Sequence, residues 1–341
     1  MLNTVYRLVE PHRIEAEFCD IDLDGDDLVV RPTYLAICNA DQRYFQGTRS
    51  SEILRKKLPM ALIHEGIGEV LYDPKKEYKA GTQVVMVPNI PLEDDEITAE
   101  NYRLSSRFRA SNTDGFMQDI VAIGRDRVVV LPDGIDSCVA AFTELVSVSY
   151  HTINRFDARA HSRRDTIGIW GDGNVAYITS LLLKNRFPES RVLIFGKHPY
   201  KMKKFVLTDK CYHIDEIPDE LQVDHAFECV GQMAAGAAIN QIIDHIRPEG
   251  CIAVMGVSEN PVPVNTRMIL EKGLTLFGSS RSGVQDFKDV ISLYEKNPEM
   301  VEHLSRIVGN VVEVKSVEDM IDAFGVDIQK RGGKTIMVWK K

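Results

Sequence analysis

The chain has 341 residues, 44% of them hydrophobic and 27% charged, a balance typical of a globular protein large enough for two domains. Its formal net charge of −9 argues against nucleic acid or an anionic membrane as the main partner. The sequence has no apolar run long enough to cross a bilayer, and residues 1–9 lack the apolar core of a secretory signal, so we expect a cytoplasmic protein.

The first part of the chain, to about Pro132, is rich in short β-like runs separated by Gly, Pro and Asp. Residues 1–9 are expected to form a first strand. Further β-like runs lie at 27–32, 66–71 and 82–88, and the acidic stretch 92–96 is typical of a solvated loop. These features predict an irregular, β-rich domain.

After about Ser137 the pattern changes to helices alternating with apolar strands. Residues 140–146 are typical of a helix. Five apolar runs then follow, at 166–170, 191–195, 225–230, 251–255 and 274–277. Buried strands separated by helices indicate a doubly wound parallel sheet covered on both faces. A helix over 285–296 and a closing strand over 334–339 are expected to complete the chain.

The strand predicted over 166–170 leads into a glycine-rich turn and an apolar helix. In such a strand–turn–helix unit the first glycine permits the tight turn, and the second lets the backbone approach a pyrophosphate at the helix N-terminus. The predicted dinucleotide-binding residues are Gly171, Gly173, Asn174, Val175 and Ala176. The alternative is an ordinary glycine-rich connection without a ligand.

The end of the second parallel strand bears on the choice of cofactor. An NAD site usually has Asp or Glu there for the ribose 2′-hydroxyl, whereas residues 195–201 contain no acid and two lysines, Lys197 and Lys201. These lysines could pair with a 2′-phosphate, which favours NADP(H); they could also be solvated surface residues. Cys229, at the end of a later strand, is expected near the nicotinamide.

Three residues far apart in the sequence have the side chains of a catalytic zinc site: Cys38, His64 and Glu144. Asp41 is of the right type to orient His64 through its second ring nitrogen. The six cysteines are scattered and form no Cys-x-x-Cys pair, so a metal site must include other ligand types. Taken singly, Cys38 could also be a packed thiol and His64 a loop residue.

These segments resemble the medium-chain dehydrogenase/reductase family, which includes alcohol, sorbitol and glucose dehydrogenases. Cys38-x-x-Asp41 resembles the family segment G-x-C-x-x-D, and residues 63–70 resemble G-H-E-x-x-G-x-V with Ile63 in place of the usual Gly. Residues 114–119 resemble G-G-[FY]-A-E-Y, and Glu144 lies where polyol-oxidising members have the Glu of an E-P-L motif. The order of these segments spans nearly the whole chain.

The resemblance implies an α/β protein with two domains. One is a GroES-like, β-rich catalytic domain formed by residues 1–145 and 282–341. The other is a Rossmann domain with a doubly wound parallel sheet, formed by residues 146–281. It also implies a catalytic zinc held by Cys38 and His64, with Glu65 and Glu144 as further or alternating ligands, and a homodimer.

Two departures from the family pattern carry information. Residues 86–112 contain no cysteine, so the four-cysteine structural zinc lobe of many relatives is absent and one zinc per chain is expected. Ala40 stands where many members have Ser or Thr, whose hydroxyl starts the proton relay. The proton is therefore expected from zinc-bound water or Glu65.

Residues 36–45 and 169–175 resemble, more narrowly, the ribulose-5-phosphate reductases, or ribitol-5-phosphate dehydrogenases, of CDP-ribitol synthesis. This resemblance implies NADPH-dependent reduction of D-ribulose 5-phosphate for wall teichoic acid or capsule, alongside a cytidylyltransferase. Arg43 and Arg49 are the predicted phosphate-binding residues. Two alternatives remain open: an NAD-dependent zinc dehydrogenase of a free polyol, and a non-catalytic nucleotide-binding sensor or scaffold.

Overall fold

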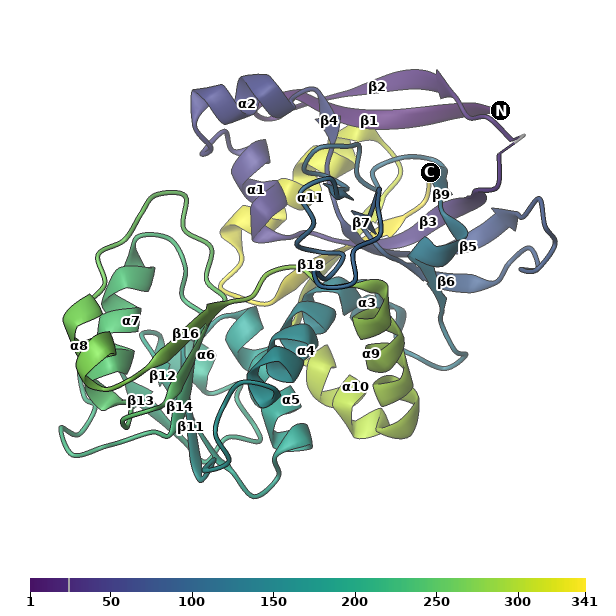
Figure 1. Cartoon of the computed structure of the whole chain (residues 1–341). Coiled ribbons are helices and arrows are strands. Elements are labelled where there is room, and N and C mark those ends of the chain that lie inside the picture. The colour runs from purple at the N-terminus through teal and green to yellow at the C-terminus, as the bar shows by residue number, and fades with distance from the viewer. Residues whose placement is uncertain (24) are drawn as a thin grey trace. The chain divides into compact units, whose positions relative to one another are not determined.

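The computed structural model describes residues 1–23 and 25–341, which divide into two compact units (Figure 1). Unit 1 comprises Met1–Ser147 and Arg281–Lys341, and unit 2 comprises Val148–Ser280. These boundaries lie close to the predicted ones. Among the described residues, the helices are too short or too polar to cross a membrane.

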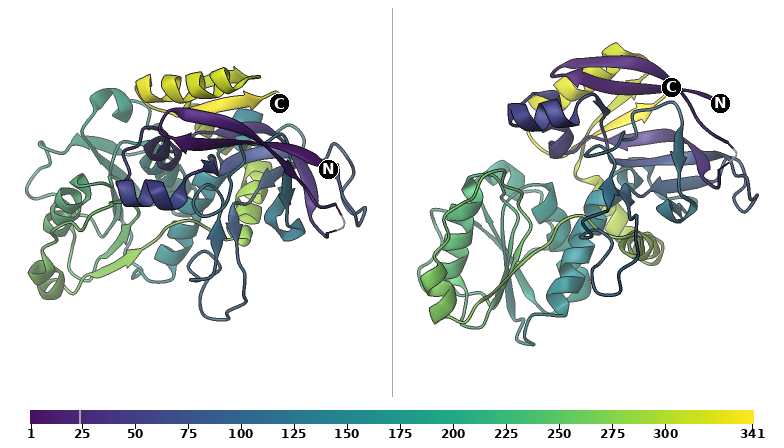
Figure 2. Two further views of the ribbon diagram at one scale, coloured as in Figure 1. Left: turned by 90° about the horizontal axis from the view of Figure 1, so that it is seen from above. Right: turned by 45° about the horizontal axis from the view of Figure 1, so that its top comes forward.

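Unit 1 is built mainly from β-strands. Its largest sheet has the order β10-β6-β5-β3-β18-β17, with β9 also paired to β3; smaller sheets have the orders β2-β1-β4 and β7-β8. Figure 2 shows both chain termini on the same side of this unit, beside β1 and β2. The strands are β1 (Leu2–Glu10), β2 (Arg13–Asp20), β3 (Leu28–Ala36), β4 (Met60–Ala61), β5 (Glu65–Tyr72), β6 (Gln83–Met86), β7 (Asn89–Ile90), β8 (Arg107–Phe108), β9 (Val121–Ile123), β10 (Val128–Val130), β17 (Val308–Val314) and β18 (Lys334–Trp339).

The pairing of β3 decides which residues meet in unit 1. Ala36 at its end lies opposite Glu65 of β5 on one side and Ile336 of β18 on the other, and both pairings are antiparallel. The last strand of the chain therefore lies in the same sheet as strands from its first third. This register places Glu65, the residues after Ala36 and the start of β18 close together.

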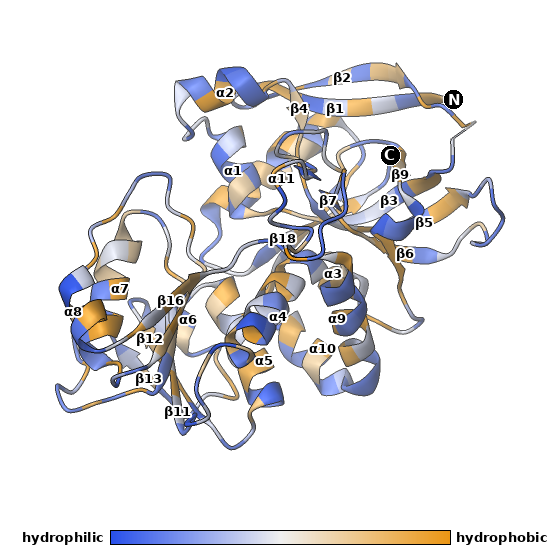
Figure 3. Cartoon of the chain, viewed as in Figure 1, coloured by the Kyte–Doolittle hydropathy of each residue, from blue (hydrophilic) through white to orange (hydrophobic). Residues whose placement is uncertain are grey.

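Several helices of unit 1 pack through apolar stripes. In α9 the buried residues Phe287, Val290, Ile291 and Tyr294 recur at helical spacing, and Figure 3 shows hydrophilic residues along the rest of this helix. The helices are α1 (Asn39–Phe45), α2 (Ser51–Lys57), α3 (Ser137–Ala140), the start of α4 (Thr143–Asp157), α9 (Val284–Lys296), α10 (Pro298–Ser305) and α11 (Val317–Gln329), with a 3-10 turn at Arg125–Arg127.

Unit 2 has a six-stranded parallel sheet in the order β13-β12-β11-β14-β15-β16, which is the strand order of a Rossmann domain. Figure 1 shows α7 and α8 beside one face of the sheet and α5 beside the other. The strands are β11 (Thr166–Trp170), β12 (Arg191–Gly196), β13 (Lys210–His213), β14 (His225–Glu228), β15 (Cys251–Val254) and β16 (Thr275–Gly278). The helices are α5 (Asn174–Arg186), α6 (Pro199–Met202), α7 (Ala234–His245) and α8 (Thr266–Glu271).

The fold class predicted from the sequence is confirmed, with local differences. The predicted helix at 140–146 is divided between α3 and α4. The strand expected over 225–230 ends at Glu228, because the Glu228 carboxylate accepts hydrogen bonds from the Val230 and Gly231 amides and turns the chain. The acidic stretch 92–96 lies outside helices and strands, as predicted.

Candidate metal centre and dinucleotide site

The side chains of Cys38, His64 and Glu65 converge in unit 1. Their donor atoms, one from each residue, all lie within 4.8 Å of one another. Cys38 follows β3 and is the N-cap residue of α1, while His64 directly precedes β5 and Glu65 begins it. The antiparallel pairing of β3 with β5 therefore assembles the cluster. Three of the four predicted metal ligands are brought together here.

Asp41 ties the Cys38 and His64 segments together. Its fully buried carboxylate accepts hydrogen bonds from the amide of Cys38 (3.1 Å) and the amide of Ile63 (3.0 Å). Its Oδ1 lies 3.6 Å from His64 Nδ1, which is an electrostatic contact rather than a hydrogen bond. Asp41 therefore faces Nδ1 of His64, and with Nδ1 oriented in this way a metal would bind through Nε2.

Ile63 adopts a left-handed backbone conformation, with φ 70°. Such a φ is unfavourable for a β-branched residue and easy for glycine. This preference explains why the family pattern has Gly at this position. Ile63 departs from the pattern at a cost in backbone strain. The Asp41 hydrogen bond to the Ile63 amide helps to hold the conformation that presents His64.

Lys334, at the start of β18, is a site residue that the sequence patterns did not reveal. Its side chain is buried, with Nζ 2.8 Å from Glu65 Oε1 and 2.7 Å from Oε2. It also donates to the carbonyl of Ile37 (2.9 Å). An isolated lysine near the end of the chain carries no local signal of this role, because Glu65 lies 269 positions away in sequence.

Glu144, the fourth predicted ligand, is buried in the first turn of α4. Burial raises its pKa to about 7, and its carboxyl interacts electrostatically with His64 and Glu65. Glu144 is therefore close enough to interact with the charges of the cluster, although it is not one of the three residues whose donor atoms lie within 4.8 Å of one another.

The donor set and the electrostatics fit a zinc ion. A thiolate, an imidazole and a carboxylate are the ligand types that catalytic zinc uses. Burial by itself lowers the pKa of His64, but the charges of Asp41 and Cys38 outweigh it and hold the pKa well above its usual range. A buried site that stabilises a positive charge in this way also favours a bound cation.

The predicted dinucleotide residues lie at the turn between β11 and α5 in unit 2. Gly171 has φ +131°, and a Cβ there would lie 3.0 Å from the Cys229 carbonyl. A Cβ added at Gly173 would meet no protein atom, so the backbone there is open to a ligand. Gly173 caps α5, whose first residues are Asn174 and Val175, followed by Ala176. The backbone amides at a helix N-terminus point towards such a ligand and can bind a pyrophosphate.

The loop after β12 carries the two predicted lysines. Asp172 holds this loop, since its Oδ2 accepts hydrogen bonds from the amides of Lys197 (2.9 Å) and His198 (2.7 Å). Lys201 Nζ lies 3.6 Å from Asp172 Oδ1, while the Lys197 side chain is exposed. Cys229 directly follows β14 beside Gly171, and burial raises its pKa well above the usual value.

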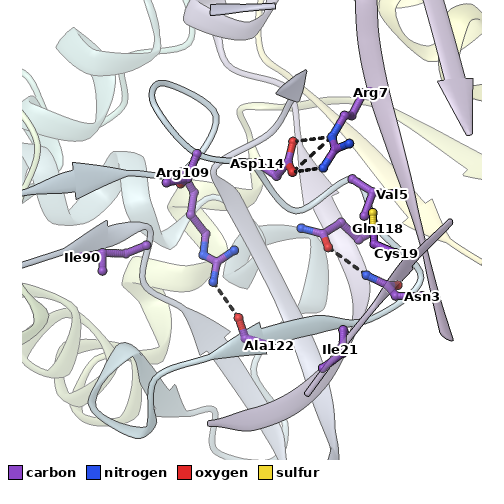
Figure 4. A pocket seen from close by; sticks show the side chains of 11 residues that line it. Asn3, Val5, Arg7, Cys19, Ile21, Ile90, Arg109, Asp114, Gln118 and Ala122 are labelled. Atoms are coloured by element: carbon purple, nitrogen blue, oxygen red, sulfur yellow. Dashed lines mark hydrogen bonds and ion pairs between the residues drawn. The ribbon is translucent and has the colours of Figure 1, made fainter. Parts of the chain in front are cut away.

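The predicted phosphate residues lie in or after α1. Arg43 is half-buried on α1, and the Arg49 guanidinium lies 4.8 Å from the centre of the Tyr44 ring. Unit 1 also has a pocket of about 340 Å³ lined by residues that include Arg109 and Arg7 (Figure 4), and none of the predicted metal ligands is among its lining residues. Arg7 pairs there with Asp114, and Arg109 donates to the Ala122 carbonyl.

Known protein families match segments of both units. Residues 24–133 match the family described as alcohol dehydrogenase GroES-like domain, and residues 205–296 match that described as zinc-binding dehydrogenase. A crystal structure of S. aureus TarJ in complex with NADPH superimposes with a TM-score of 0.90 at 47% identity, covering 100% of both chains.

Curated relatives match over the full length. The ribulose-5-phosphate reductase of Bacillus spizizenii is 52% identical over 340 residues, which is 100% of both chains. Ribulose-5-phosphate reductase 1 of Staphylococcus aureus is 51% identical over 99% of each chain, and the enzyme of Streptococcus pneumoniae is 42% identical over 100% of this chain and 98% of its own. The chain therefore belongs to the zinc-dependent medium-chain dehydrogenases and, within them, to the ribulose-5-phosphate reductase family.

Proposed function

We propose that this protein reduces D-ribulose 5-phosphate to D-ribitol 5-phosphate with NADPH and one zinc ion, in the cytoplasm, to supply CDP-ribitol for wall teichoic acid or capsule. One observation carries the proposal. A chain 52% identical along its whole length to a ribulose-5-phosphate reductase also places the donor atoms of Cys38, His64 and Glu65 within 4.8 Å of one another.

The residues of unit 1 hold and orient the metal. Cys38 and His64 supply the thiolate and the imidazole, and Glu65 and Glu144 are the carboxylates available as further or alternating ligands. Bound zinc supplies a Lewis acid that polarises the ketone of the substrate. Asp41 keeps Cys38 and His64 in position through the contacts described above.

The proton that the product hydroxyl requires cannot come from the residue two positions after Cys38, because Ala40 has no hydroxyl. Two sources are then available: zinc-bound water, and Glu65, which lies within the cluster. The Lys334 ammonium keeps the Glu65 carboxylate in one orientation from both of its oxygens.

Unit 2 supplies the hydride donor's binding site. Gly171, Gly173 and the first turn of α5 receive the pyrophosphate of NADPH. Lys197 is the stronger candidate for the 2′-phosphate, because the charge of Lys201 is partly offset by Asp172. Lys197→Gln should raise the KM for NADPH and leave that for NADH unchanged; Lys203→Gln, an exposed neighbour, is the matched control.

Initial rates with D-ribulose 5-phosphate test the proposal directly. NADPH should support turnover far better than NADH, a chelator should abolish it, and added zinc should restore it. If zinc-loaded enzyme ignores ribulose 5-phosphate and oxidises sorbitol or xylitol with NAD, the substrate and cofactor are wrong while the metal chemistry stands. Failure with every polyol and ketose phosphate would favour a non-catalytic nucleotide-binding protein.

We also propose that the protein is a homodimer that works with a cytidylyltransferase of the same pathway. What supports a dimer is β16, which ends the parallel sheet of unit 2 and has one strand neighbour, β15, among the described residues. Pairing of such edges across a two-fold axis would extend the sheet. Light scattering of the zinc-loaded enzyme should give twice the chain mass, and a monomer would contradict the dimer.

A further inference from the structure

Arg281, the first residue of the segment that returns to unit 1, has a half-buried guanidinium with an unusual lack of partners. Among the described residues it makes no ion pair and donates no hydrogen bond; its guanidinium carbon instead lies 4.5 Å from the centre of the Phe108 ring. A guanidinium has five N–H donors, so a group so placed has capacity for an anionic ligand.

The backbone of Arg281 is also strained. Its φ of 57° lies in the left-handed region, which a residue with a long side chain rarely adopts. Strain of this kind is often found at functional sites, where the fold holds a side chain in a required position. Here the position is above Phe108.

Phe108 connects Arg281 to the metal cluster. The Phe108 ring also packs against the imidazole of His64, with the ring centres 5.4 Å apart. One aromatic ring therefore separates the guanidinium from a metal ligand. Arg281 is also close enough to Glu144 for their charges to interact.

Lys57, at the end of α2, adds a second positive charge. It is half-buried, and the described residues offer it no ion-pair partner. Burial lowers its pKa, and the nearby charges of Lys56, Arg281 and Arg49 lower it further. The charges of Lys57 and Arg281 repel each other, and a bound anion would offset that repulsion.

We propose that Arg281, assisted by Lys57, binds the phosphate group of the substrate and sets the preference for a ketose phosphate over a free ketose. This inference rests on the proposed function. Ribulose 5-phosphate has its ketone at C2 and its phosphate on C5 of one short carbon chain. When the ketone lies at the metal, the phosphate must therefore bind close to the metal site. The fork of a guanidinium fits two phosphate oxygens.

The test compares Arg281→Gln with Arg55→Gln, an exposed arginine on α2 that serves as the matched control. Two measurements are made on zinc-loaded enzyme with bound NADP⁺ or NADPH: calorimetric affinity for D-ribulose 5-phosphate, and kinetics with D-ribulose 5-phosphate and with free D-ribulose. We expect Arg281→Gln to weaken binding and raise the KM for the phosphorylated substrate by about 10- to 100-fold, the range typical of one lost charged hydrogen bond.

Kinetics with free D-ribulose and the KM for NADPH should remain unchanged in Arg281→Gln, and Arg281→Lys should recover part of the affinity. Equal losses on both ketoses would show a merely structural role and overturn the inference, as would unchanged affinity. If the wild-type enzyme binds ribulose 5-phosphate without reducing it, and Arg281→Gln weakens that binding, the proposed function is refuted and the phosphate site is supported. Wild-type enzyme that neither binds nor reduces it would overturn both.

Discussion

At the scale of single residues, replacing Lys334 tests whether its ammonium stabilises the buried Glu65 carboxylate. Lys334 is only 2% exposed, and its ammonium lies between Glu65 and the Ile37 carbonyl. Lys334→Met should lower the free energy of unfolding by about 3–5 kcal/mol, because it leaves a buried carboxylate without its partner. Chemical denaturation of zinc-loaded and chelated protein measures this loss.

The double variant Lys334→Met/Glu65→Gln is the control for that interpretation. Removing both charges leaves no uncompensated ion, so most of the lost stability should return. If the double variant is as unstable as Lys334→Met, the cost comes from packing around Lys334 and not from the ion pair.

Replacing the two glycines of the β11–α5 turn should have separable effects, one on stability and the other on cofactor affinity. Gly171 has φ +131° and lies against the Cys229 carbonyl, so Gly171→Ala should lower stability by about 1 kcal/mol or more through backbone strain. Gly173→Ala meets no protein atom and has ordinary backbone angles, with φ −89°. It should therefore fold normally.

The added methyl of Gly173→Ala would, however, occupy the space that a pyrophosphate needs. We expect its NADPH affinity to fall about tenfold or more, measured by quenching or enhancement of nicotinamide fluorescence, with thermal stability unchanged. Unchanged affinity in Gly173→Ala would contradict the assignment of this turn to the pyrophosphate.

At the scale of elements, His225 joins β14 and β15 in a way that makes stability depend on pH. Its Nδ1 accepts a hydrogen bond from the Cys251 amide (3.1 Å), so the neutral ring carries its proton on Nε2, which faces the His161 carbonyl (3.2 Å). Burial, with a smaller contribution from the nearby His161, lowers the pKa of His225 from 6.5 to about 4.

Because the native pKa lies below the unfolded one, the unfolded chain binds this proton first as the pH falls. The contribution of His225 is fully present above pH 6.5 and is lost as the pH falls towards 4, amounting to about 3 kcal/mol at most. His225→Asn should be less stable at neutral pH but lose less stability between pH 6.5 and 4. Denaturation at a series of pH values measures this, with His213→Gln on β13 as the control.

The elements that could be predicted were those with strong apolar runs. Strands β11, β12, β14, β15 and β16 all correspond to such runs, although β16 has only one buried residue. The edge strand β13 (Lys210–His213) was missed because its half-buried sequence, which begins with Lys and ends with His, has no apolar run. The segment α10–β17–α11 was also missed, since β17 alternates exposed and partly exposed residues and is stabilised by pairing with β18, a non-local contact.

The convergence of Cys38, His64 and Glu65 was predictable to the extent that these residues lie in local motifs. Cys38 with Asp41, and His64 with Glu65, are close neighbours in sequence and could be recognised there. Lys334 and Arg281 come from the opposite end of the chain and stand in no motif. Their roles depend on the pairing of β18 with β3 and on packing against Phe108, which only the fold reveals.

At the scale of the whole molecule, the two chemistries are divided between the two units. The residues that form the metal cluster belong to unit 1, and the glycine-rich turn with the loop after β12 belongs to unit 2. Each unit has its own hydrophobic core. Loss of the metal should therefore leave the cofactor site folded.

Cys38→Ser tests this division. It should abolish turnover and lower the zinc content, because a serine hydroxyl is a poor replacement for a thiolate ligand. Its affinity for NADPH should stay within about twofold of the wild-type value, since the contacts to the dinucleotide come from unit 2. Cys19→Ser is the matched control, because Cys19 is a half-buried thiol of unit 1 outside the cluster and should keep both zinc and activity. Parallel loss of zinc and NADPH affinity in Cys38→Ser would mean that the metal supports the fold of the cofactor site, and the two units would then have to be treated as one energetic unit.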